Sequence, residues 1–344
     1  MQLSIKSRNY HFELEFQGKF NFILGNSGTF KTLLGNLLTK YKRGINGISV
    51  KISDDRFKMK KESVHILGND TVFEGDYKNI FNVIGHLFVI DECCEIFKKR
   101  DLSSILKESK NYFIIISRKV PGFLPVSIDS VYHLERKKDI IFNVPEYAKS
   151  NEELTSFAQS IDYISTEDSA SSLKVLKTLF GENRVGNARA YNGKEIVIRN
   201  NNQLPAILEN ELDEKKRNIL VVFDAAAFGA FYPALVKVIG KRNDISILAW
   251  ESFEWFVLSG KPFNMKITKN DVGYENNSVE QLATKTLAEY IHYDKSSLPG
   301  CLKYKEHECQ GQCKLRCKVI NNFSLDDLMH DELEKVRLLV TVQS

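Results

Sequence analysis

Apolar and polar residues alternate with a period of two near the start of the chain, and helical patterns appear between later apolar runs. Alternation is typical of strands, and short continuous apolar runs are typical of strands buried on both faces. The pattern predicts strands at 2–6, 10–16, 20–24, 47–52, 63–67, 87–91, 112–117 and 130–135. Helices are expected from Lys31 to about Lys40 and at 94–109. Strands separated by helices indicate a doubly wound, parallel α/β sheet, which we assign to a domain at 1–148.

A second alternating series follows a polar stretch at 146–160, which we interpret as a linker and a helix. The pattern predicts strands at 162–168, 218–224 and 245–250, a strand and turn at 184–194, and helices at 169–181, 204–215, 225–241 and 251–258. This order indicates a second, Rossmann-like α/β domain at 160–265. We expect the remainder, 266–344, to form a C-terminal helical region with helices at 278–292 and 324–340.

A glycine-rich loop lies between the apolar strand at 20–24 and the helix that begins at Lys31. In this context backbone N–H groups and the helix N-terminus point at phosphates, where the helix dipole favours negative charge. We therefore predict an ATP site formed by Gly25, Asn26, Ser27, Gly28, Thr29, Phe30, Lys31 and Thr32. Lys31 is expected to reach the terminal phosphates, and the Thr32 hydroxyl to bind Mg²⁺. Phe30 replaces the second glycine of the usual G-x-x-x-x-G-K-[ST] pattern. The motif therefore predicts nucleotide binding but does not by itself predict hydrolysis.

Two acidic residues end a later apolar strand, in the segment LFVIDE. Asp91 is expected to hold the Mg²⁺ ion, and Glu92 to act as the catalytic group that polarises a water molecule. Ser117 and Arg118 end the strand YFIIISR, where many P-loop ATPases sense the terminal phosphate. The alternative for Arg118 is a solvated side chain at the rim of the sheet.

Acidic residues also follow the predicted strands of the second domain. Glu167 and Asp168 follow the first strand, Asp224 the third, and Glu251 and Glu254 the fourth. The carboxyl ends of parallel strands meet in one crevice, and Mg²⁺ prefers carboxylate oxygens. We therefore predict a metal site at Glu167 and Asp224, which together with Glu251 are the candidate catalytic acids. The alternative is that these acids cap the helices that follow them, which suits Asp168 and Glu251 better than Asp224, because Asp224 ends a strongly apolar strand.

The order of these residues resembles a Toprim domain, the metal-binding fold of topoisomerases, DnaG-type primases and certain nucleases. Glu167 matches the acid after the first strand of that family, and Gly193 matches the glycine after the second. Asp224 matches the first acid of the D-x-D motif after the third strand. The second acid of that motif is missing, because Ala226 stands in its place.

Glu251 or Glu254 is the candidate replacement for the missing acid. A P-loop ATPase followed by a Toprim domain is similar in layout to the overcoming-lysogenization-defect (OLD) nucleases. That resemblance implies an ATP-regulated nuclease that acts on DNA, in phage defence or on mobile elements. It also implies Mg²⁺ as the ion that serves the acidic site.

Four of the six cysteines lie close together near the C-terminus. They are Cys301, Cys309, Cys313 and Cys317, and His307 lies among them. Four thiolates suit tetrahedral Zn²⁺, and a reducing compartment favours metal binding over disulfides. We therefore predict a structural zinc site, with free or redox-active thiols in a basic loop as the alternative.

The overall charge and hydropathy change this interpretation little. A formal net charge of +4 permits a nucleic-acid partner without requiring one. The first residues lack the apolar core of a signal peptide, and no run of about 18 apolar residues occurs, so we expect a cytoplasmic protein without a membrane span.

The leading hypothesis is an ATP-binding module that controls a Toprim-like, Mg²⁺-dependent module acting on nucleic acid, with homodimerisation as one means of control. One alternative is a nucleotide-dependent switch or scaffold that hydrolyses little and cuts nothing. Another is a phosphotransferase acting on small molecules or nucleotides, which the first domain alone would permit.

Overall fold

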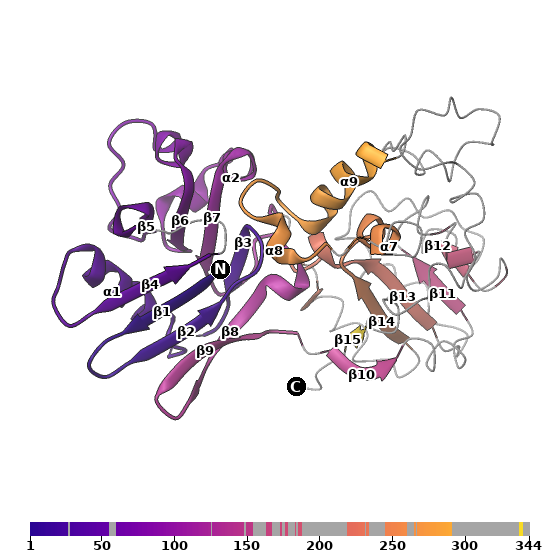
Figure 1. Ribbon diagram of the computed structural model, residues 1–344, viewed down its shortest axis with the longest axis horizontal. Coiled ribbons are helices and arrows are strands. Elements are labelled where there is room, and N and C mark those ends of the chain that lie inside the picture. The colour runs from indigo at the N-terminus through magenta and orange to yellow at the C-terminus, as the bar shows by residue number, and fades with distance from the viewer. Residues whose placement is uncertain are drawn as a thin grey trace. The chain divides into compact units, whose positions relative to one another are not determined.

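The computed structural model consists of two compact units, each built around a β-sheet (Figure 1). The first unit comprises Met1–Tyr147 and Thr268–Ser278, and the second comprises Ala148–Ile267 and Val279–Ser344. The structure describes residues 1–26, 28–54, 60–124, 126–147, 149–153, 163–166, 173, 176–177, 183, 185–187, 219–230, 232–233, 245–259, 265, 267–290 and 337–339.

The first unit contains a nine-stranded sheet with the strand order β4-β1-β2-β9-β8-β3-β7-β6-β5. Its strands are β1 (Gln2–Lys6), β2 (His11–Glu15), β3 (Phe20–Ile23), β4 (Ser49–Ser53), β5 (Val64–Leu67), β6 (Ile84–Asp91), β7 (Lys110–Ile116), β8 (Val131–Lys137) and β9 (Ile140–Pro145). Neighbours from β8 through β3, β7 and β6 to β5 pair in parallel. The chain is thus an α/β protein with a large, mostly parallel sheet.

The predicted parallel arrangement does not extend to one side of this unit. Strands β4, β1 and β2 pair antiparallel, and β9 forms a hairpin with β8 before it pairs in parallel with β2. Short turns join β1 to β2 and β8 to β9, and such turns leave no room for the crossover that parallel pairing requires. Strand β9 itself was not predicted from the sequence.

Helices and short 3₁₀ turns connect the strands of the first unit. They are α1 (Lys31–Lys42), η1 (Lys61–Ser63), η2 (Tyr77–Asn82), η3 (Glu95–Lys98), α2 (Leu102–Glu108) and η4 (Ile128–Ser130). The single helix predicted at 94–109 is wrong, because it is divided into η3 and α2. Asp101, at the break, accepts hydrogen bonds from Tyr77 and Lys78, and such side-chain contacts compete with helix continuation.

Alternate residues of the central strands face two separate apolar layers. Leu87 and Val89 of β6 pack in the layer that includes Leu34 of α1. Phe88 and Ile90 of the same strand pack in the other layer, which includes residues of α2. Side chains of a strand point alternately to its two faces, so both faces of β6 are buried. This double burial explains the continuous apolar run that the sequence shows there.

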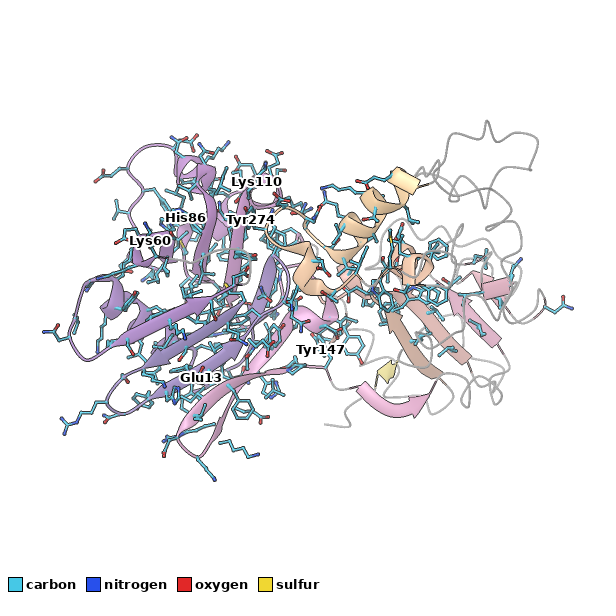
Figure 2. All side chains as sticks on the ribbon, viewed as in Figure 1. Glu13, Lys60, His86, Lys110, Tyr147 and Tyr274 are labelled. Carbon is cyan, nitrogen blue, oxygen red and sulfur yellow. The ribbon has the colours of Figure 1, made fainter. Side chains whose placement is uncertain are left out.

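A segment from far downstream completes the first unit. It contains α8 (Lys269–Val272) and Tyr274, which Figure 2 labels. The ring of Tyr274 meets that of Tyr112 in β7 edge to face, with 5.6 Å between centroids. Lys19 is 1% exposed, and its Nζ donates to Lys107 O at 2.8 Å, to Ser109 O, and to Asn277 Oδ1 at 3.0 Å. The sequence-based assignment of this segment to a separate C-terminal region did not anticipate these contacts.

The second unit contains a six-stranded sheet with the order β10-β15-β14-β13-β11-β12. Its strands are β10 (Lys149–Glu153), β11 (Tyr163–Thr166), β12 (Val185–Asn187), β13 (Ile219–Asp224), β14 (Ile245–Trp250) and β15 (Arg337–Leu339). The helices of this unit whose bounds the structure describes are η7 (Ala225–Ala227), α7 (Phe253–Ser259) and α9 (Val279–Tyr290). Strands β12, β11, β13 and β14 pair in parallel, as the sequence predicts for an α/β arrangement.

Two predictions for the flanking segments are wrong where the structure describes them. Residues 149–153, interpreted as part of a linker and helix, form β10, which pairs with β15. Residues 337–339, at the end of the helix predicted for 324–340, form β15 itself. Pairing between segments that are distant in the chain overrides local helical propensity at both places. Within the described ranges, no helix combines the length and the apolar character needed to cross a bilayer.

Replacing Lys19 with Met should lower the free energy of unfolding by roughly 2–4 kcal/mol, because the buried acceptors around Nζ lose a charged donor. Urea denaturation measures this loss. The matched control is Lys107→Met. Lys107 accepts from Lys19 through its backbone oxygen, but the residue is exposed, so removing its ammonium group should change stability little. Equal stability of the two variants would contradict the burial and bonding described for Lys19.

Candidate functional site in the first unit and the acids of the second

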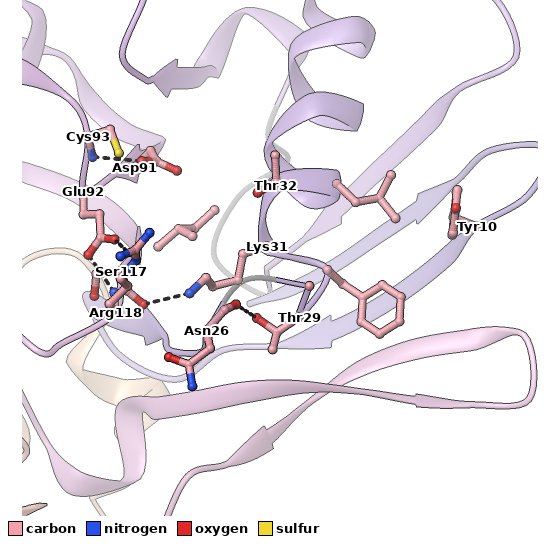
Figure 3. A pocket seen from close by; sticks show the side chains of 14 residues that line it. Tyr10, Asn26, Thr29, Lys31, Thr32, Asp91, Glu92, Cys93, Ser117 and Arg118 are labelled. Carbon is pink, nitrogen blue, oxygen red and sulfur yellow. Dashed lines mark hydrogen bonds and ion pairs between the residues drawn. The ribbon is translucent and has the colours of Figure 1, made fainter.

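A cavity of about 410 Å³ lies at the carboxyl ends of β3, β7 and β6 in the first unit (Figure 3). Ile23 of β3 and Asp91 of β6 both pair with Ile116 of β7, so the three strand ends are level. Two backbone bonds extend the ladder: Ser117 N donates to Ile23 O at 3.1 Å, and Glu92 N donates to Ile116 O at 2.9 Å. The loops that follow these strands therefore converge on one crevice.

The loop after β3 turns tightly around two glycines. Gly25 has a φ of 145°, and a Cβ there would lie only 2.5 Å from Thr29 Oγ1. The same hydroxyl donates to Asn26 O at 2.8 Å and closes the turn. Gly28 has a φ of 90°, which residues with a side chain rarely adopt. Both glycines are thus required by the backbone of the loop.

Phe30 adopts the left-handed conformation that glycine adopts at low cost. Its φ is 62° and its ψ is −4°, directly before the first residue of α1. This conformation costs a residue with a side chain roughly 1–2 kcal/mol. The ring is partly buried against the apolar layer that contains Leu34, and this packing offsets part of the cost. The loop therefore carries backbone strain directly before Lys31.

Lys31 lies between the glycine-rich loop and the end of β7 (Figure 3). Its Nζ donates to Ser117 O at 3.3 Å. Burial lowers the pKa of Lys31, while the charges of Glu92 and Asp91 act in the opposite direction and offset only part of the shift. The first turn of α1 carries no acid and no side-chain cap from Phe30. Its N–H groups and Lys31 therefore present positive potential to the cavity.

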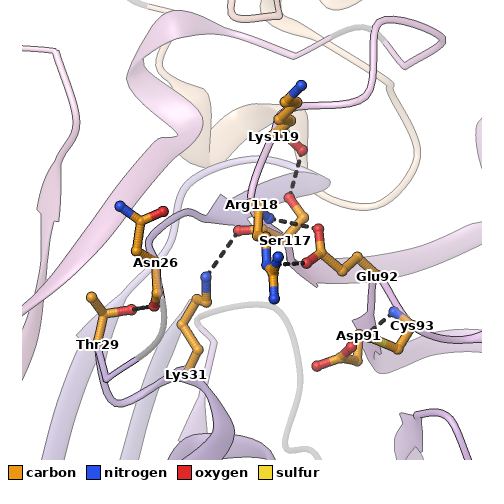
Figure 4. A network of polar contacts seen from close by, with 9 residues as sticks. All are labelled: Asn26, Thr29, Lys31, Asp91, Glu92, Cys93, Ser117, Arg118 and Lys119. Atoms are coloured by element: carbon orange, nitrogen blue, oxygen red, sulfur yellow. Dashed lines mark hydrogen bonds and ion pairs between the residues drawn. The ribbon is translucent and has the colours of Figure 1, made fainter.

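The acids lie on the β6 side of the cavity (Figure 4). Arg118 N donates to Glu92 Oε2 at 2.7 Å, and Arg118 Nε lies 3.4 Å from Glu92 Oε1. Asp91 Oδ1 accepts the N–H of Cys93 at 2.9 Å. A hydrogen bond to Asp91, together with the charges of Asp91 and Glu92, raises the pKa of the Cys93 thiol. This thiol is therefore protonated at neutral pH and a weak nucleophile.

The structure brings most of the residues predicted for the nucleotide site into this one cavity. Those that line it are Asn26, Gly28, Thr29, Phe30, Lys31, Thr32, Asp91, Glu92 and Arg118. Gly25 shapes the loop, because a Cβ there would meet the Thr29 side chain, and Ser27 lies outside the described residues. Residues that are distant in the chain thus meet where the predicted chemistry needs them.

Tyr10 lines the same cavity and was not predicted from the sequence. It closes the turn between β1 and β2, where Ser7 N donates to Tyr10 O at 2.8 Å. Figure 3 shows Tyr10 and Glu92 on opposite sides of Lys31. No motif marks this tyrosine, because it meets the loop after β3 only in the folded chain, where Tyr10 and Phe30 pack against the same apolar layer.

In the second unit, Asp224 holds neighbouring elements together. It ends β13 and pairs with Trp250 at the end of β14. Its Oδ1 accepts hydrogen bonds from Trp250 Nε1 at 2.7 Å and from Phe253 N at 3.1 Å. The second bond satisfies an N–H group at the start of α7, so Asp224 caps this helix from a different strand. This differs from the alternative that we set against metal binding, in which each acid caps the helix that follows it, because Asp224 makes no side-chain cap bond to η7.

Ala226, in the second unit, stands where the D-x-D motif has its second acid, and it is buried. Ala226 is 0% exposed, and its N–H donates to Glu251 O at 3.0 Å. The backbone of Glu251, which follows β14, is therefore fixed beside the end of β13. Glu254, the other candidate replacement, lies in the first turn of α7 and is buried.

Several predicted residues lie outside the described residues. They are Glu167, Asp168, Gly193, Cys301, His307, Cys309, Cys313 and Cys317. Among the residues that the structure does describe, no group of three or more His, Cys, Asp or Glu side chains is placed to hold a metal ion. The predictions of Mg²⁺ and Zn²⁺ sites therefore remain predictions.

The strain at Phe30 is tested by comparing two variants that both remove the ring. Phe30→Gly should be more stable than Phe30→Ala by about 1 kcal/mol, because alanine keeps the cost of positive φ and glycine does not. At an ordinary helix-forming position alanine is the more stable of the two. Urea denaturation of both variants gives the order, and greater stability of Phe30→Ala would contradict the left-handed geometry.

The chain matches no protein-family model, no curated protein and no solved structure. The resemblances to P-loop ATPases and to Toprim domains therefore rest on the order of the motifs in this chain. Function has to be argued from the residues around the cavity and from the acids at the ends of β13 and β14.

Proposed function

We propose that the first unit binds ATP with Mg²⁺ in the cavity at the ends of β3, β7 and β6. The observation that carries the proposal is the convergence of Lys31, the N-terminus of α1, Asp91 and Glu92 on this cavity. A helix N-terminus beside a lysine suits the phosphates, and acids on the opposite side suit their metal ion. A cavity of about 410 Å³ falls in the size range of small-molecule sites.

The phosphates of ATP would replace Ser117 O as the hydrogen-bond acceptor of Lys31. Its ammonium group now donates to Ser117 O, a neutral carbonyl, at 3.3 Å. A phosphate oxygen is the stronger acceptor because it is charged. The N–H groups of the glycine-rich loop and of the first turn of α1 would bind the remaining phosphate oxygens.

Thr32 and Asp91 are the proposed protein contacts of Mg²⁺, which keeps several waters when it binds between phosphates and carboxylates. The ion would stabilise negative charge on the phosphates. If ATP is hydrolysed, a water oxygen attacks the terminal phosphorus while the bond to the bridging oxygen breaks, and Glu92 accepts the proton of that water.

Tyr10 and Phe30 are the proposed contacts of the adenine base. Both line the cavity, and Tyr10 lies across Lys31 from Glu92 (Figure 3). Aromatic rings bind bases by stacking, which is tolerant of base identity. Phe30 would thus provide contact area at the place where the usual motif has glycine.

For the second unit we propose a Toprim-like, Mg²⁺-dependent role on nucleic acid under the control of ATP, with Glu167, Asp224 and Glu251 as its acids. The order β12-β11-β13-β14 supports it, because connections diverge between β11 and β13. Ligands of open α/β sheets bind beyond the carboxyl ends of strands at such a point. The four C-terminal cysteines are the proposed ligands of a structural Zn²⁺.

A second candidate function is a nucleotide-dependent switch or scaffold with little catalysis. Two observations favour it. Asp224 Oδ1 already accepts two hydrogen bonds, from Trp250 and from the start of α7. The second acid of the D-x-D motif is replaced by the buried Ala226. Both features favour a structural use of the strand end over metal-dependent cleavage.

Substituting Lys31 by Ala should weaken ATP binding by roughly 10- to 100-fold or more, because a partly buried cation no longer pairs with the phosphates. Isothermal titration calorimetry with Mg²⁺–ATP measures this. Lys40→Ala, at an exposed position in the last turn of the same helix, is the matched control and should bind like wild type. Undiminished binding by Lys31→Ala would overturn the proposed ATP site.

Nuclease activity is tested with supercoiled plasmid and Mg²⁺ or Mn²⁺, with and without ATP. We expect wild type to nick or cut the plasmid and Asp224→Asn to lose this activity. The asparagine keeps an oxygen that can accept from Trp250 and Phe253, so it removes the charge while preserving the cap of α7. Absence of cleavage by wild type under every condition would favour the switch or scaffold instead.

A further inference from the structure

The acid proposed to activate water is held by the residue that follows β7. Arg118 contacts both oxygens of the Glu92 carboxylate, one through its backbone N–H at 2.7 Å and the other through Nε at 3.4 Å (Figure 4). The backbone contact is fixed by the sheet, since Ser117 N and Glu92 N both donate to neighbouring strand ends. The guanidinium contact depends only on the side chain.

The guanidinium contact is readily exchanged. The Arg118 side chain is 70% exposed and that of Glu92 is 34% exposed. Exposed ion pairs contribute little net free energy, so a stronger anion can displace the carboxylate. The planar fork of arginine matches phosphate oxygens as well as it matches a carboxylate.

The segment that follows β7 also contacts the proposed phosphate-binding lysine. Ser117 O accepts from Lys31 Nζ, and the next residue, Arg118, binds Glu92. Both residues line the cavity together with Lys31 and Glu92. A terminal phosphate in this cavity would thus bind both Lys31 and Arg118. Their present partners are Ser117, after β7, and Glu92, after β6.

We propose that Arg118 is a positioning residue that holds Glu92 until the terminal phosphate of a nucleoside triphosphate takes its guanidinium. Release of that contact frees one oxygen of Glu92 to turn toward the attacking water. A nucleoside diphosphate lacks the group that competes, so it leaves the pair intact. The inference rests on the proposed ATP site and adds to it a means of distinguishing triphosphate from diphosphate.

A double-mutant cycle with ATP and ADP tests this exchange. Glu92→Gln removes the competing charge, so ATP should bind about two- to fivefold more tightly, the range expected for an exposed pair, while ADP affinity stays unchanged. Arg118→Met keeps the length of the side chain without its charge and should weaken ATP more than ADP. In the Arg118→Met background, Glu92→Gln should no longer improve ATP binding.

Charge controls separate this exchange from general electrostatics. Glu95→Gln removes an exposed negative charge close to Glu92 in sequence, and Lys119→Gln removes an exposed positive charge next to Arg118. Neither residue lines the cavity, so both variants should bind ATP and ADP with affinities near those of wild type. If Glu92→Gln improves ATP binding equally in the presence and absence of Arg118, or improves ADP binding as much, the carboxylate acts by repulsion alone and the proposal is wrong.

Failure of the proposed ATP site gives a different result. In that case wild type and Lys31→Ala show the same weak or absent binding of both nucleotides, and the ATP site and the exchange are overturned together. If wild type binds ATP in a manner that depends on Lys31 but the cycle shows no coupling, only the exchange is overturned.

Discussion

The parallel register of three strands determines where chemistry is possible in the first unit. Ile23, Ile116 and Asp91 are level across β3, β7 and β6, and backbone bonds from Ser117 and Glu92 continue the same ladder. A shift of one residue in either pairing would turn the side chains at the strand ends to the opposite face. The apolar layers on both faces oppose such a shift, because every residue of β6 from Leu87 to Ile90 is buried. The geometry of the cavity is therefore a consequence of core packing.

Local strain adds to this constraint at the start of α1. Phe30 has a positive φ that a glycine would adopt more easily, yet it packs against the layer that includes Leu34. Strained residues persist where the surrounding structure fixes them, and they cluster at functional sites. Here the strain lies next to Lys31, whose ammonium group is partly desolvated. A lysine in such surroundings gains more from a phosphate than a solvated lysine would, because its own hydration is already reduced.

Local patterns predicted the loop, the helix from Lys31 and the acids after β6, because each depends on residues close in sequence. They could not predict Tyr10, which reaches the cavity through packing against the apolar layer that Phe30 also contacts. They also could not predict that Lys19 bonds Asn277, which is more than two hundred residues away. The acid at Asp224 was correctly placed at a strand end, but its hydrogen bonds to Trp250 and to α7 depend on packing. Long-range pairing explains the errors at β10 and β15, where a partner strand outweighs local propensity.

Strand β7 connects several of these features within the first unit. Its carboxyl end leads to Ser117 and Arg118, which contact Lys31 and Glu92. Near its start, Tyr112 packs against Tyr274, in a segment that the chain enters from Ile267 and leaves into Val279, both assigned to the second unit. A buried strand is stiff, so a change at its end cannot be absorbed locally without disturbing its packing. Coupling between two sites is shown by an element with two arrangements whose equilibrium both sites bias. In the first unit β7 is the element to test for this, because it contacts the proposed phosphate site at one end and Tyr274 at the other.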